Sequence, residues 1–133
     1  MLQAQGLEIT FNPGTPIENH VLRGLDLTIP TGQFVTVIGS NGAGKSTFLN
    51  AVSGDLMVDK GSIKIDGQDV TAKSAWQRAD QVARVFQDPM AGTCEALTIE
   101  ENMALAWKRG AKRGFHFSVN KTLRELFRDK LSM

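Results

Sequence analysis

A glycine-rich segment in the first third of the chain constrains the fold most. It reads Gly39-Ser40-Asn41-Gly42-Ala43-Gly44-Lys45-Ser46 and matches the pattern G-x-x-x-x-G-K-S/T in full. A continuous apolar run at 34–38 precedes it, and residues 45–52 place Phe48, Leu49 and Val52 on one helical side before Gly54. An unbroken apolar run is typical of a strand covered on both faces. The sequence therefore predicts a buried strand, a glycine loop and a helix in direct succession.

Each fixed position of this loop has a chemical reason. Glycines allow positive φ and leave backbone N–H groups open to phosphate oxygens. The loop ends at a helix N-terminus, whose N–H groups and dipole favour an anion. Lys45 supplies a positive charge for the β- and γ-phosphates, and the Ser46 hydroxyl is a ligand for Mg²⁺. A turn without a ligand needs neither side chain, so we predict a loop that binds the phosphates of ATP, a Walker A loop.

Length and composition indicate one globular domain. The chain has 133 residues, of which 41% are hydrophobic and 22% charged. It has no apolar run of the 18 or so residues that span a bilayer, and its first ten residues lack the pattern of a secretory signal. Its single cysteine, Cys94, excludes an internal disulfide and agrees with a reducing compartment.

Periodicity predicts the remaining elements. Strands are expected at 2–11 and 25–29, at 61–65 before an Asp66-Gly67 turn, and at 82–86. Helices are expected at 74–81, after a capping box formed by Thr98 and Glu101, and at 119–131 with the apolar stripe Leu123, Leu126 and Phe127. Asp66 precedes a glycine and is interpreted as a turn residue.

Four segments together resemble the nucleotide-binding subunits of ABC transporters. They are G-S-N-G-A-G-K-S-T (39–47), G-S-I-K-I-D-G (61–67), V-F-Q-D-P (85–89) and L-T-I-E-E-N-M-A-L (97–105). The resemblance implies an α/β P-loop NTPase fold of the ABC type. Residues 1–88 would be the ATP-binding core, made of an antiparallel β subdomain and part of a RecA-like core with the Walker A loop and the Q-loop. Residues 89–133 would begin the helical subdomain, and the C-terminal half is absent.

The same resemblance implies roles for individual residues. Lys45 and Gln87 would be catalytic, and Ser46 and Gln87 would bind Mg²⁺. Read without the loop, Gln87 would be an ordinary solvent-facing glutamine. Phe11 stands where the family places an aromatic ring on adenine, but it is equally the last core residue of the first strand. The full set expected to bind ATP is Phe11, Gly39, Ser40, Asn41, Gly42, Ala43, Gly44, Lys45, Ser46 and Thr47.

Several family motifs are not found. The chain has no L-S-G-G-Q signature, since Leu131-Ser132-Met133 stops short of the glycines, and no Walker B aspartate, catalytic glutamate or switch histidine. The chain therefore resembles the N-terminal half of a subunit. In the family two subunits enclose ATP between them, so we expect these residues to bind nucleotide without hydrolysing it alone. We also expect uncovered apolar strand edges and self-association.

The resemblance implies a subunit that couples ATP binding and hydrolysis to solute transport. Its partners would be a second ATPase subunit and a transmembrane permease, with a solute-binding protein as a further candidate and with no nucleic acid. It would be cytoplasmic, on the inner face of the membrane. Residues 108–130 carry eight lysines and arginines against two acids. This basic stretch leaves an alternative open, a soluble ABC-type ATPase acting on ribosomes or DNA; a non-enzymatic nucleotide-binding module is a third reading.

His20 and His116 lack metal-ligand spacing with each other or with Cys94, and both are interpreted as surface or loop residues. Met90 and Met103 are expected to be packing residues.

Overall fold

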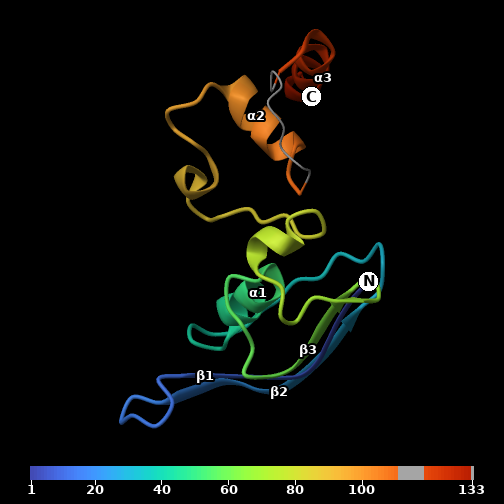
Figure 1. Ribbon diagram of the computed structural model, residues 1–133. Coiled ribbons are helices and arrows are strands. Elements are labelled where there is room, and N and C mark those ends of the chain that lie inside the picture. The colour runs from blue at the N-terminus through green and yellow to red at the C-terminus, as the bar shows by residue number, and fades with distance from the viewer. Residues whose placement is uncertain (111–118, 133) are drawn as a thin grey trace. The chain divides into compact units, whose positions relative to one another are not determined.

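The computed structural model describes residues 1–110 and 119–132 (Figure 1). The chain forms two compact units, Met1–Val82 and Ala83–Met133, which are described separately below. The boundary predicted between residues 88 and 89 stays a prediction.

The first unit contains a four-stranded antiparallel sheet. Its strands are β1 (Leu2–Phe11), β2 (Asn19–Ile29), β3 (Lys60–Ile65) and β4 (Gln68–Asp69), in the order β2-β1-β3-β4. Figure 1 shows β1, β2 and β3 as one curved layer, with β1 and β2 joined as a hairpin. The predicted strands at the start of the chain and at 61–65 are confirmed. The second strand begins earlier than predicted, at Asn19, and the two-residue strand β4 follows the Asp66-Gly67 turn.

A β-bulge explains the irregular alternation of the first strand. The buried residues are Ala4, Leu7 and Ile9, so the buried face changes parity after Ala4. A Cβ atom at Gly61 of β3 would lie 2.5 Å from the carbonyl oxygen of Gly6, so only glycine allows the strands to approach at this point. The extra residue keeps Leu7 and Ile9 in the core, where Ile63 of β3 is fully buried with them.

Helix α1 (Lys45–Ser53) packs its buried residues Phe48 and Ala51 into the same core and ends at Gly54 with φ +83°. The helix predicted at 74–81 is reduced to a short 3₁₀ helix, η1 (Ala75–Arg78).

The buried side chain of Arg78 ties η1 to the carboxyl end of α1. Its Nη1 atom donates to the carbonyls of Ala51 and Val52, at 2.6 and 2.8 Å. Its Nε and Nη2 atoms donate to the carbonyls of Lys73 and Thr71. Burial lowers the pKa of the guanidinium, while the charges of Asp55 and Asp69 act in the opposite direction. The positive charge of Arg78 also interacts favourably with the negative end of the helix dipole at the carboxyl end of α1.

We predict that Arg78→Met lowers the free energy of unfolding of this unit by about 3 kcal/mol, because it leaves several buried carbonyls without a donor. Chemical denaturation followed by circular dichroism measures the change. Arg23→Met is the matched control, since Arg23 is exposed and donates to a single carbonyl, that of His20. Equal losses in the two variants would contradict the role assigned to Arg78.

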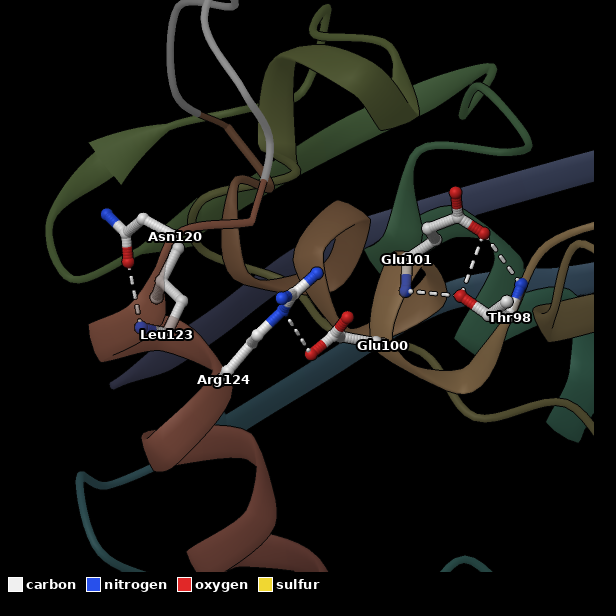
Figure 2. Close-up of polar contacts among 6 residues, drawn as sticks. All are labelled: Thr98, Glu100, Glu101, Asn120, Leu123 and Arg124. Atoms are coloured by element: carbon white, nitrogen blue, oxygen red, sulfur yellow. Dashed lines mark hydrogen bonds and ion pairs between the residues drawn. The ribbon is translucent and has the colours of Figure 1, made fainter.

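The second unit contains the 3₁₀ helix η2 (Pro89–Gly92) and the helices α2 (Ile99–Trp107) and α3 (Lys121–Leu131). Figure 2 shows the predicted capping box: Glu101 N–H donates to Thr98 Oγ1, and Thr98 N–H donates to Glu101 Oε2. The N–H and the hydroxyl of Thr98 both donate to the carboxylate of Glu101, and these hydrogen bonds lower its pKa. The last helix begins two residues later than predicted because Asn120 caps it through the N–H of Leu123 (Figure 2).

The apolar run before the glycine loop forms no strand in this structure. Residues 34–38 form no strand pair with another described segment, and Phe34 and Ile38 are 95% and 89% exposed. The prediction of a buried strand there is wrong for the described residues. The reason is that a strand needs a hydrogen-bonded neighbour and a buried strand needs cover on both faces, whereas the four strands of this unit pair only with one another. The strand predicted at 82–86 is absent for the same reason, and Val85 is 96% exposed.

We predict that the 133-residue polypeptide self-associates through residues 34–38, because an exposed apolar segment outside any sheet is a template for strand pairing. The double variant Phe34→Lys, Ile38→Lys is expected to lower its average mass in sedimentation velocity. A control with lysine at Ile17 and Trp76, which are also exposed, is expected to leave the association in place. Equal mass for both double variants would contradict the assignment to this segment.

Candidate functional site

The glycine loop has the backbone that the sequence predicts. Gly42 and Gly44 have φ angles of +83° and +84°, a region that other residues rarely adopt. Gly44 is also buried against β2, where a Cβ atom would lie 3.1 Å from side-chain carbons of both Val21 and Leu22. The loop is thus held close to the strand, and glycine at position 44 is required for two separate reasons.

The loop leads directly into α1, with Gly44 as the N-cap residue. A glycine has no side chain to cap the N–H groups of the first turn, and the first turn contains no acidic residue. The free N–H groups and the positive end of the helix dipole therefore favour an anion at this point.

Lys45 closes the loop on itself. Its ammonium group donates to the carbonyls of Gly39 and Ser40, each at 2.7 Å. The carbonyl groups of Gly39 and Ser40 thus stabilise the loop through their hydrogen bonds with Lys45. An ammonium group has three donors, so one remains for a ligand beside the first turn of α1.

A cavity of about 360 Å³ opens beside the loop. It is lined by Phe11, Asn19, Val21, Asn41, Gly42, Ala43, Gly44, Lys45, Ser46 and Thr47. Phe11 is 38% exposed, so it is not the last core residue of β1. The structure places its ring at the same cavity as the loop, at the opposite end of the β1–β2 hairpin from Met1.

Asn19 and Val21 were not identified from the sequence, because the start of β2 was predicted six residues too late. The signal that could have found Asn19 is the hairpin itself, since Asn19 pairs directly with Phe11. Residues opposite one another in an antiparallel pair share a face of the sheet.

The Ser46 side chain is compatible with a magnesium ion. Its hydroxyl lines the cavity, is exposed and makes no hydrogen bond to another described residue. Among the described residues, no group of three His, Cys, Asp or Glu side chains could hold a metal. A single hydroxyl is a sufficient protein ligand for an ion that keeps several waters and binds phosphate oxygens.

Gln87 belongs to the second unit, as an exposed residue in a bend just before η2. The adjacent Asp88 accepts a hydrogen bond from the N–H of Met90 at 2.9 Å and so fixes the start of η2. The roles of Gln87 and of the loop residues 39–47 in binding or catalysis stay predictions.

Other residues singled out in the sequence have local roles. Asp66 lies in the turn after β3 with φ +47°, as predicted. It also forms an ion pair with the amino terminus. His20 lies in β2 and is half-buried, rather than on a loop or on the surface. Met90 is exposed rather than packed, and His116 lies outside the described residues. In the basic stretch, Arg124 of α3 pairs with Glu100 of α2 at 3.0 Å (Figure 2).

A glycine loop with two positive φ angles, a lysine and an uncapped helix N-terminus define the phosphate-binding loop of a P-loop protein. The comparisons with known proteins narrow this class. The ABC transporter family model matches residues 22–132, so the chain belongs to the ABC transporter family.

Curated relatives agree with this assignment. The chain is 44% identical over 112 residues to a tyrosine transport ATP-binding protein of Clostridioides difficile, which covers 83% of this chain. It is 34% identical over 125 residues to an energy-coupling factor transporter ATP-binding protein of Acetivibrio thermocellus, which covers 92% of this chain. The matched region spans 44% of the length of each relative.

Solved structures confirm the predicted fold class. The dimeric structure of a bacterial ABC transporter cassette matches with a TM-score of 0.79 and 25% identity, over 99% of this chain and 56% of that chain. A post-hydrolysis state of an ATP-binding cassette bound to ADP and phosphate matches with a TM-score of 0.78 and 26% identity. Within the described residues, no helix combines the length and apolar character that crossing a membrane requires.

Proposed function

We propose that this chain is the nucleotide-binding portion of an ABC transporter ATPase subunit, which binds ATP with Mg²⁺ at the loop 39–47. The cavity beside this loop carries the proposal: it joins an uncapped helix N-terminus, the Lys45 ammonium and the exposed ring of Phe11. The first two suit phosphates and the third suits a base, so the three together fit a nucleotide better than a free anion.

In the proposed complex, the loop N–H groups and Lys45 bind the β- and γ-phosphates, and Phe11 stacks on the base. Mg²⁺, when bound, would neutralise charge on the phosphates, and Ser46 is the described residue that would hold it. Gln87 would orient the attacking water, since a neutral amide both donates and accepts without titrating.

The proposed assembly contains a second ATPase subunit and a transmembrane permease. A dimeric cassette among the similar structures and transporter subunits among the relatives support both partners. The proposed location is therefore the cytoplasmic face of a membrane, and a solute-binding protein is a further partner for an importer.

We predict that Lys45→Ala weakens binding of Mg²⁺-ATP at least tenfold, because the alanine removes the cation that faces the phosphates. Isothermal titration calorimetry, or displacement of a fluorescent ATP analogue, measures the affinity. Lys73→Ala is the matched control, since Lys73 lies in the same unit outside the cavity and its side chain makes no hydrogen bond to a described residue. Unchanged affinity in Lys45→Ala would refute binding at this loop.

A second prediction concerns turnover. The 133-residue polypeptide is expected to release phosphate from ATP no faster than its Lys45→Ala variant, because it has no Walker B aspartate, catalytic glutamate or signature sequence. A coupled assay under steady-state conditions makes the comparison. Turnover clearly above that of the variant would show that residues 1–133 activate water by themselves.

A further inference from the structure

We propose that Asn19 selects adenine over guanine at this cavity. The proposal rests on the nucleotide site proposed above and adds the base that the site prefers. It follows from three side chains, those of Phe11, Asn19 and Val21, which line the cavity from the β1–β2 hairpin rather than from the phosphate loop.

The sheet places Phe11 and Asn19 on one face. They are direct partners in the antiparallel register of β1 and β2. Side chains of such partners lie on the same face, with Cβ atoms about 5 Å apart. Val21 lines the same cavity from the point of β2 where the register shifts, between the pairs Thr10–His20 and Ile9–Leu22. The hairpin end of the cavity thus combines a ring, an aliphatic group and one amide.

Asn19 is the polar group at this end. Its side chain is exposed and makes no hydrogen bond to another described residue, so both its donor and its acceptor are available. The other amide lining the cavity, that of Asn41, belongs to the phosphate loop. A base stacked on Phe11 would therefore meet Asn19 at its edge.

The chemistry of an amide distinguishes the two purines. Its carbonyl accepts from the adenine N6 amino group while its NH₂ donates to N7, which gives a bidentate pair. Guanine presents two acceptors, O6 and N7, on the same edge, and the amide carbonyl has no donor to meet there. Stacking on Phe11 does not discriminate, because every base has a π face.

The test compares ATP, GTP and inorganic tripolyphosphate as ligands of the 133-residue polypeptide, each with Mg²⁺. The wild-type chain is expected to bind ATP about tenfold more tightly than GTP. In Asn19→Ala this ratio should fall to within about twofold of unity, while the affinity for tripolyphosphate is unchanged. The matched control is Ile17→Ala in the same hairpin, because Ile17 is 71% exposed and does not line the cavity.

A second variant tests which edge of the base meets Asn19. Asn19→Asp replaces the amide with a carboxylate of the same shape, which only accepts hydrogen bonds. The carboxylate can still accept from the adenine N6 amino group, but on the same edge of guanine it meets two acceptors, O6 and N7. Asn19→Asp should therefore keep the preference for ATP over GTP that Asn19→Ala loses, an outcome that loss of support in the hairpin does not explain.

A wild-type chain that does not distinguish ATP from GTP would overturn the proposal, and so would an Asn19→Ala variant that keeps the wild-type ratio. These failures differ from failure of the nucleotide site itself. If Lys45→Ala binds all three ligands as tightly as the wild type does, the proposed nucleotide site is wrong. If Lys45→Ala binds none of them tightly and Asn19→Ala keeps the selectivity of the wild type, the nucleotide site stands and only the role proposed for Asn19 is wrong.

Discussion

The buried guanidinium of Arg78 is the interaction on which the candidate site depends. It donates to the last carbonyls of α1 and to carbonyls of the segment that leads to η1, so it fixes the carboxyl end of the helix. The amino end of the same helix is the phosphate loop. A helix of nine residues is marginal without tertiary contacts. The position of the loop therefore depends on a residue more than thirty positions further along the chain. A glycine at position 54 is required as well, because its φ is +83° and a Cβ atom there would lie 2.9 Å from the backbone nitrogen of Ala75.

A second constraint connects the two ends of the cavity. Gly44 lies against Val21 and Leu22, where a Cβ atom would lie 3.1 Å from a side-chain carbon of each, so the glycine loop packs directly on β2. Because β2 pairs with β1, this contact also fixes the distance from the loop to Phe11 and Asn19. The antiparallel sheet thus sets the spacing between the glycine loop and the two hairpin residues of the proposed base site. A bulkier residue at position 44 would change the loop and the spacing of the cavity together.

The sequence predicted the phosphate loop and its helix well because each fixed position follows from backbone chemistry that needs no distant partner. Strand β1, without its bulge, and the capping box of Thr98 and Glu101 were predicted for the same reason, since their patterns are local. Residues 34–38 were not, because whether an apolar run forms a strand depends on neighbours that the run itself does not specify. Asn19 was missed because it gains its place only through the hairpin register with Phe11.

Lys45 supports the glycine loop from within. Two of the three ammonium donors are bound to the carbonyls of Gly39 and Ser40, which lie at the beginning of the loop. These bonds join the beginning of the loop to the first residue of α1. Substitution of Lys45 therefore has two consequences, loss of a charge and loss of this support. Substitution of the exposed Ser46 is expected to affect ligand binding alone, since its hydroxyl makes no hydrogen bond to another described residue. Comparing variants at these two adjacent positions separates the cost of positioning the loop from the cost of binding the ligand.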